Sequence, residues 1–289
     1  MDAIAHRRRR RPEAEGRRDE VDGRPRSSER PRERVVVLRR VGGRIGEEDA
    51  HSAPRVESTV DHLVRTWNVF HGNAHPPRRR SYLRVAIELS VEDGPSVVCL
   101  QELPLWSLPR LAVWTGYRSF PAVARRGMTP RRVAGWITRQ WQVTLRSAIT
   151  GQANAILVRQ DLGARALVTV QVSRGRRERR VVQAVRVDGI GVVANAHLSQ
   201  RDPQTATEEL RRAVAVARSQ AAAGEPIVLA GDFNIEHPEV DGFGGAIAGL
   251  DQVLVQGAPA TPAVVWPEER RTRDGVVLSD HTPVEVTVR

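Results

Sequence analysis

Short apolar runs alternate with polar turns along most of the chain. The run HLVRTWNVF at 62–70 is rich in β-forming residues and predicts a strand that ends near Asn68. SVVCLQEL at 96–103 is almost continuously apolar, which is typical of a strand buried on both faces. Further runs predict four successive strands at 154–159, 166–172, 180–187 and 191–198, with a turn at 174–179. Three more strands are predicted at 226–234, 250–255 and 280–288.

Two segments have helical periodicity instead. Residues 81–93 place Leu83, Ile87 and Leu89 near one face. Residues 202–224 form the clearest helix, with capping residues at its start and Gly224 as its stop signal. Residues 71–80 read as a loop. The stretch 104–150 scatters tryptophans among Pro, Gly and Arg, so it predicts a short helix and a long loop.

The chain has 289 residues, of which 40% are hydrophobic, enough for one large α/β domain or two small ones. Residues 1–58 are rich in charge, Pro and Gly, and we expect a disordered Arg-rich tail, since they cannot bury enough apolar surface to offset the entropy of ordering. The run VVVLRRV at 35–41 is its one strand-like piece. The tail is a plain extension, a stretch read from a misplaced start codon, or a polybasic arm. Residues 59–289 are expected to form the folded domain.

The net charge of +11 suggests a polyanionic partner such as nucleic acid or an anionic membrane. Every Lys/Arg residue is arginine, however, which is typical of the coding bias of a GC-rich genome, so charge alone does not predict DNA binding. The single cysteine, Cys99, excludes an internal disulfide framework and a cysteine-based zinc site. No apolar run is long enough to span a bilayer and no signal-peptide core follows the N-terminal arginines, so a cytoplasmic protein is expected. A monomer is also expected.

Polar or acidic residues follow the apolar strands at their carboxyl ends, where α/β folds gather their sites. Singly, each has an ordinary explanation as a cap or turn residue. Their recurrence after successive strands favours a shared site. The residues are Asn68, Glu102, Asn195, His197, Asp232, Asn234, Asp280 and His281.

The motifs TWNVFHGN, CLQE, NAHL, AGDFN, GLDQVL and LSDHTPV, in this order, resemble the signature series of the endonuclease/exonuclease/phosphatase (DNase-I-like) superfamily. The resemblance runs from about Thr66 to the C-terminus. It implies an α/β fold, a four-layer sandwich of two mixed β-sheets flanked by helices, with the site at one rim. It also implies a hydrolase that cuts a P–O bond by in-line attack of a metal- and histidine-assisted water.

The resemblance implies a metal site and a cofactor. Glu102 matches the principal metal ligand, and Asn68 and Asp280 are expected to contribute further oxygen contacts. A phosphodiester repels nucleophiles, so the chemistry favours a hard cation with oxygen ligands: Mg²⁺, with Mn²⁺ as a substitute.

The catalytic roles are also implied by the resemblance. Asp232 matches the residue that orients or deprotonates the attacking water, and Asn234 is expected to donate to a phosphate oxygen. His281 is expected to act either as base or as phosphate-binding donor, with Asp251 fixing its tautomer. His197 matches the histidine that steadies developing charge, and Asn195 is a supporting hydrogen-bonding residue.

Other polar residues point less clearly to the site. We expect His71, Asn73 and His75 to be exposed in their loop. Arg270, Arg271 and Arg273 either bind anionic substrate or form a solvated run. The tryptophans between 106 and 141 are expected to pack in the core or under loops rather than stack on bases.

The motif GDFN differs from that of inositol polyphosphate 5-phosphatases, and the short span from GDFN to GLDQVL leaves little room for a duplex-inserting device like that of AP endonucleases. The chain therefore resembles the uncharacterised bacterial branch of the superfamily. The leading hypothesis is a phosphodiesterase acting on DNA or RNA. The alternatives are a lipid (sphingomyelinase-like) or small-phosphoester hydrolase, a catalytically silent nucleic-acid-binding module, and a tether that binds nucleic acid through its tail.

Overall fold

The computed structural model describes residues 60–140, 146–174, 179–200 and 202–289. The predicted tail at 1–58, with its strand-like run at 35–41, lies outside these residues, and its boundary stays a prediction. Within the described chain, no helix is both long and apolar enough to cross a bilayer.

Two mixed β-sheets form the frame of the domain. In the six-stranded sheet the order is β11 (Val264–Val265), β14 (Val284–Val288), β1 (His62–Asn68), β3 (Val97–Leu103), β5 (Gln152–Val158) and β4 (Arg118–Arg125). In the five-stranded sheet it is β10 (Asp251–Gln256), β9 (Ile227–Asp232), β8 (Gly191–His197), β7 (Val181–Val187) and β6 (Ala164–Gln171). One parallel pair lies in each sheet, β1 with β3 and β8 with β9. A small third sheet joins β12 (Thr272–Arg273), β13 (Val276–Leu278) and β2 (Ala74–His75).

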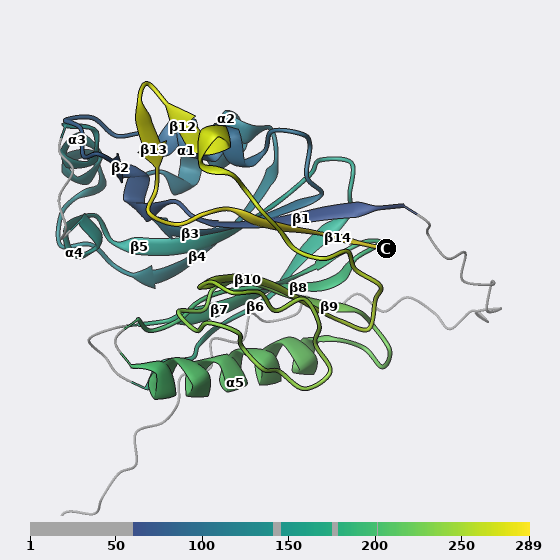
Figure 1. Ribbon diagram of the computed structural model, residues 1–289. Coiled ribbons are helices and arrows are strands. Elements are labelled where there is room, and N and C mark those ends of the chain that lie inside the picture. Colours follow the sequence, from purple (N-terminus) through teal and green to yellow (C-terminus); the bar gives the residue numbers. More distant parts are fainter. Residues whose placement is uncertain (1–59, 141–145, 175–178, 201) are drawn as a thin grey trace, which may run out of the picture. The chain divides into compact units, whose positions relative to one another are not determined.

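Helices cover the outer faces of both large sheets, as Figure 1 shows. The α-helices are α1 (Leu83–Ser90), α2 (Leu111–Thr115), α3 (Arg131–Gln140), α4 (Arg146–Thr150) and α5 (Pro203–Gln220). Three 3-10 turns span Phe70–Gly72, Leu108–Arg110 and Glu268–Arg271. The helix at 202–224 is confirmed, and Asp202 caps it by accepting hydrogen bonds from the backbone N–H groups of Gln204 and Thr205. It ends at Gln220, short of Gly224.

Three large apolar clusters of the described residues separate these layers because successive side chains of a strand point to opposite faces. On β3, Val98 and Leu100 pack outward under α1. Val97 and Cys99 pack inward, against the five-stranded sheet. A third cluster joins the other face of the five-stranded sheet to α5. The expected four-layer α/β sandwich is therefore confirmed.

The stretch 104–150 holds more regular structure than its sequence predicts. It contains α2, the edge strand β4, α3 and α4 instead of one short helix and a long loop. β4 includes Pro121, which lacks a backbone N–H and so is confined to edge strands. Its pairing with β5, register Ala122↔Asn154, is a long-range contact that local sequence does not encode.

Asn195 on β8 ties the two sheets together. Its buried amide nitrogen donates to the backbone carbonyls of Leu100 (3.1 Å) and Ala155 (3.0 Å), both in the opposite sheet. Its amide oxygen accepts from Gln101 Nε2 at 2.8 Å. A fully buried amide with every group satisfied fixes how one sheet lies on the other, which supports the expected hydrogen-bonding role.

We expect Asn195→Ala to lower the free energy of unfolding by about 3 kcal/mol, because it leaves two carbonyls and an amide buried without their partner. Urea unfolding followed by circular dichroism measures this. Gln160→Ala, an amide loss at an exposed position, is the control and should be nearly neutral. A cost for Asn195→Ala no larger than that of the control would show that the sheets do not depend on this link.

His62 at the start of β1 makes stability depend on pH. It is 3% exposed, and its Nδ1 lies 3.2 Å from Ser96 Oγ. Burial, and then the charge of Arg159, lower its pKa. Above pH 6.5 the imidazole is neutral in both the folded and unfolded states. Below that pH the unfolded chain binds a proton that the folded chain does not, so stability falls as the pH falls.

The expected loss from His62 is up to about 1.4 kcal/mol per pH unit below about pH 6.5. His62→Gln should make the decline of unfolding free energy between pH 6.5 and 5 shallower. His75→Gln, at an exposed position, should keep the wild-type slope. If His62→Gln also keeps that slope, His62 does not titrate as its burial requires.

Candidate active site

The carboxyl ends of four strands meet at one rim of the sandwich. Asn68 ends β1 and Glu102 lies near the end of β3, the neighbouring parallel strand. His197 ends β8 and Asp232 ends β9, and these two residues are paired in register. Since parallel strands end at the same edge, residues far apart in the sequence are brought to one place.

Glu102 lies on a β-bulge. The pairing of β3 with β5 shifts register between Leu100 and Leu103, and Glu102 has a φ of 57°, which L-residues rarely adopt. Its carboxylate oxygens lie 3.6 Å from His71 Nε2 and 3.9 Å from His197 Nε2. Burial, followed by the charge of Asp232, raises its pKa to about 7. The bulge therefore places an acid where its own charge is poorly stabilised.

Asp232 is the centre of the rim and is 1% exposed. Its Oδ2 accepts from Asn68 Nδ2 at 2.9 Å, and lies 3.4 Å from His197 Nε2 and 3.7 Å from His281 Nε2. Burial raises its pKa. Asp232 thus joins both sheets to the two histidines through one carboxylate.

His281 and Asp251 form a dyad. His281 Nδ1 lies 2.7 Å from Asp251 Oδ2, and Asp251 begins β10 beside Asp232 in register. Burial alone would lower the pKa of His281, but the hydrogen bond to Asp251 and the charge of that residue outweigh burial and raise it. The imidazole is therefore held protonated, with Nε2 facing Asp232.

The backbone of the His281 loop is anchored to β1. Trp67 Nε1 donates to the His281 carbonyl at 3.1 Å. Ser279 Oγ donates to the Asn68 carbonyl at 2.7 Å and accepts from the His281 N–H at 3.1 Å. Ser279 was not identified from the sequence, although the LSDH motif contains it. Its role is to fix the loop that carries the histidine.

His197 has the opposite charge state. Arg180 Nη1 lies 2.8 Å from its Nε2, and because a guanidinium only donates, that nitrogen must be the unprotonated acceptor. Nδ1 lies 3.0 Å from the side-chain amide of Gln152. Burial, and then the charge of Arg180, lower the pKa of His197 well below its ordinary range. His197 is a neutral imidazole.

Arg180 and Gln152 were missed by sequence reasoning. Arg180 closes a run of arginines at 174–180 in which no pattern distinguishes one residue from the next. Gln152 precedes an apolar strand, where a polar residue is ordinary. Only the pairing of the two sheets brings both to His197.

The expectation that His71 and Asn73 are exposed is wrong. Both are buried, at 3% and 7% exposure, and only His75 is exposed. Phe70 and His71 have φ values of 46° and 51°, a strained turn that directs His71 toward Glu102. The first residues of the loop belong to the rim, and residues 75–80 are exposed.

The remaining predicted residues lie at or near the rim. The backbone N–H of Asn234 donates to Asp232 Oδ1 at 3.1 Å, and its side chain donates to the Leu198 carbonyl at 3.0 Å. Asp280 is exposed, and its charge contributes to raising the pKa of Glu102.

The arginines before the LSDH motif have structural partners. Arg271 is buried and donates to the carbonyls of Leu278 and Ser279. Arg270 stacks on Trp266 at 3.6 Å from the ring centroid. Arg273 donates to two backbone carbonyls of its own turn. Of the tryptophans, Trp106 is buried as expected, whereas Trp136 is 53% exposed.

Two arrangements of groups at the rim offer ligands to a cation. Asp232, Asp251 and His281 bring ligand atoms within 4.8 Å of one another. In that group, His281 Nδ1 and Asp251 Oδ2 are already engaged with each other at 2.7 Å, so His281 Nε2 and Asp251 Oδ1 are the atoms left to a metal ion. The carboxylate of Glu102 receives no hydrogen bond from the described residues, and Asp232 and Asp280 both raise its pKa. A divalent cation relieves that repulsion, so Glu102 fits a hard, oxygen-seeking metal better.

Comparisons with known proteins agree with this geometry. The model of the Endonuclease/Exonuclease/phosphatase family matches residues 66–282. The chain belongs to the Endonuclease/Exonuclease/phosphatase family. The resemblance drawn from the motifs is confirmed. Members of this family are phosphoesterases and nucleases that generally use divalent metals. Among curated proteins, none matches the chain by sequence.

Solved structures share the fold at low identity. An endonuclease/exonuclease/phosphatase from Beutenbergia cavernae is 18% identical (TM-score 0.56), covering 79% of this chain and 71% of its own. Truncated Caenorhabditis elegans TDP2 is 16% identical (TM-score 0.54), and the match covers 79% of this chain and 97% of that protein. Bacteroides thetaiotaomicron mannosyl-6-phosphatase Bt3783 is 13% identical (TM-score 0.52), and the match covers 79% of this chain and 99% of that protein.

We expect Asp251→Asn to lower the pKa of His281 by about 1 to 3 pH units, because it removes the negative charge and leaves the packing unchanged. Titration of the His281 ring by NMR without added metal measures this. Asp274→Asn, at an exposed position, should leave the His281 titration unchanged. An unaltered His281 in Asp251→Asn would mean that the dyad does not set its charge.

Proposed function

We propose that the protein is a divalent-metal-dependent phosphodiesterase that hydrolyses nucleic acid by in-line attack of an activated water. The observation that carries the proposal is the meeting of Glu102, Asp232 and His281 at one rim. These groups lie on different strands and loops. Glu102 and Asp232 are poorly solvated carboxylates, and His281 carries a stabilised positive charge.

Glu102, with Asp280 and the amide oxygen of Asn68, would hold the cation. A bound Mg²⁺ or Mn²⁺ polarises a phosphoryl oxygen and neutralises charge on the phosphate. Asn68 Oδ1 accepts from the Phe70 N–H at 3.0 Å, and a carbonyl oxygen retains a second lone pair.

Asp232 is suited to orient the attacking water and accept its proton, because burial raises its pKa and makes it a stronger base. Asn68 fixes this carboxylate from one side. The water oxygen forms the new P–O bond, its proton passes to Asp232, and the bond from phosphorus to the leaving oxygen breaks.

His281 is suited to donate to a phosphate oxygen or to the leaving oxygen. Sequence reasoning left open whether it acts as base or donor, and the protonated state supported by Asp251 favours the donor. The neutral His197, supported by Arg180, and the side chain of Asn234 would contact the other phosphate oxygens.

A small phosphoester remains the second candidate substrate. The structural neighbour Bt3783 carries the name mannosyl-6-phosphatase, but at 13% identity the likeness is one of fold. A substrate panel with Mg²⁺, Mn²⁺ or EDTA separates the candidates: plasmid, single-stranded DNA, RNA, sphingomyelin, a sugar phosphate and bis-p-nitrophenyl phosphate. Cleavage of the sugar phosphate, a phosphomonoester, without cleavage of any phosphodiester would overturn the phosphodiesterase proposal.

We expect Glu102→Gln to reduce metal-dependent turnover by at least about a thousandfold, because it removes the principal negative ligand of the cation. Calorimetric titration with Mn²⁺ should lose its binding heat while the melting temperature is retained. Glu88→Gln, at a half-buried position on α1 where Glu88 pairs with Arg84, is the matched control and should behave as wild type. Wild-type turnover in Glu102→Gln would remove this residue from the metal site.

A further inference from the structure

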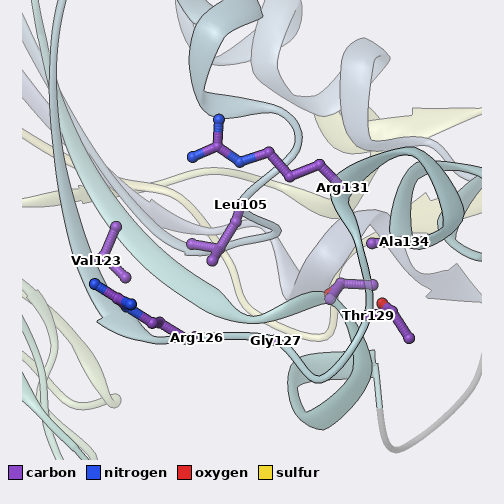
Figure 2. A pocket seen from close by; sticks show the side chains of 8 residues that line it. Leu105, Val123, Arg126, Gly127, Thr129, Arg131 and Ala134 are labelled. Carbon is purple, nitrogen blue, oxygen red and sulfur yellow. The ribbon is translucent and has the colours of Figure 1, made fainter.

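A cavity of about 380 Å³ lies between the end of β4, the start of α3 and the end of α4. Figure 2 shows the side chains that line it, with the guanidinium groups of Arg126 and Arg131 extending to the same side and Leu105 between them. The lining residues are Leu105, Val123, Arg126, Gly127, Thr129, Arg131, Ala134 and Thr150.

The cavity lies beside the catalytic rim. Leu105 follows Glu102 by three residues, and its N–H donates to the Thr150 carbonyl at 3.3 Å. Thr150 precedes Gln152, whose side chain contacts His197. Three residues of chain span at most about 11 Å, so the backbone of Leu105 lies within that distance of the backbone of Glu102.

The charge around the cavity is of one sign. Residues 103–160 contain nine arginines and no aspartate or glutamate. Arg126 and Arg131 are exposed and form no ion pair with any acidic residue of the described chain, unlike Arg84, Arg159 and Arg186. A coding preference for arginine over lysine does not explain the absence of carboxylates. Two cations that line one cavity without a counter-charge favour an anionic ligand, and guanidinium groups match phosphate oxygens in pairs.

The walls of the cavity suit a nucleotide rather than a bare ion. Leu105, Val123 and Ala134 supply apolar surface next to the two guanidinium groups. Arginine contacts to a phosphate combined with apolar contacts to sugar and base suit a nucleotide unit of a single strand.

We propose that this cavity is a subsite for a second phosphate of a nucleic-acid strand, one to about three nucleotides from the phosphate being cleaved. The inference rests on the proposed function and gives it a substrate class. A polynucleotide presents phosphates at a regular spacing, so it can fill the catalytic rim and the cavity together. A phospholipid with a single phosphate can fill only one of them.

The test compares two double variants of the full-length protein. Arg126→Gln/Arg131→Gln removes both cavity cations. Arg132→Gln/Arg139→Gln removes the same charge from exposed positions of α3 that do not line the cavity. The arginines of residues 1–58 are present in both variants, so their contribution cancels.

The substrates are a single-stranded DNA hexanucleotide and bis-p-nitrophenyl phosphate, which carries one phosphate and no neighbour. We expect the cavity variant to lose about 10- to 100-fold in kcat/KM on the hexanucleotide and to keep its rate on bis-p-nitrophenyl phosphate within about twofold. The dependence of log kcat/KM on log salt concentration should become shallower by about 0.7 for one lost phosphate contact. The control variant should lose much less on the hexanucleotide.

Three outcomes would overturn the subsite. The first is an equal loss on both substrates, which indicates a disturbed catalytic rim. The second is an equal loss in both double variants, which indicates diffuse charge. The third is weakened binding to phosphatidylserine vesicles with hexanucleotide cleavage unchanged, which indicates a membrane surface.

Failure of the proposed function gives a different result. If the wild type cleaves no phosphodiester, hexanucleotide binding is measured by fluorescence anisotropy in EDTA. Weaker binding in the cavity variant than in the control then supports the subsite while the hydrolase proposal fails. Equal binding in both variants rejects the subsite as well.

Discussion

The buried carboxylate of Asp232 is the interaction on which the rim depends. It accepts a hydrogen bond from Asn68, a residue of the opposite sheet, and lies within 3.7 Å of both His197 and His281. A carboxylate removed from water is costly unless donors and positive charge surround it. The two sheets must therefore meet with their strand ends aligned, and the inter-sheet bonds of Asn195 hold them in that arrangement.

Different neighbours explain why two histidines of one site differ in charge. His281 gains its proton because Asp251 and Asp232 both face it. His197 loses its proton because it is buried and receives a hydrogen bond from Arg180. Neighbouring titratable groups whose pKa values are driven apart are the usual basis of an acid–base division of labour. In the proposed reaction, His281 is the cationic donor, Asp232 the base and His197 the neutral contact.

Beside the rim, the arginine-rich stretch between β3 and β5 places positive charge next to the carboxylates of the rim. The rim concentrates carboxylates that a cation would neutralise, and the adjacent cavity concentrates cations that a phosphate would neutralise. A strand of phosphates bound to a divalent metal matches this alternation of charge. The strained backbone at Glu102, Phe70 and His71 lies at the rim, and backbone strain is usually retained at functional sites.

The sequence by itself determined the class of the fold, most of its strands and the residue types at the rim. Apolar alternation and carboxyl-end polar residues are local signals, and they are sufficient to single out Asn68, Glu102, Asp232 and His281. Tertiary structure alone decided the rest. Arg180 and Gln152 reach His197 only through the packing of two sheets, and His71 is buried only because its turn folds back on Glu102. β4 forms because β5 lies beside it, and the anion cavity exists because α3 and α4 pack at the end of that edge. Such contacts join residues with no periodic relation along the chain, which is why no local pattern predicts them.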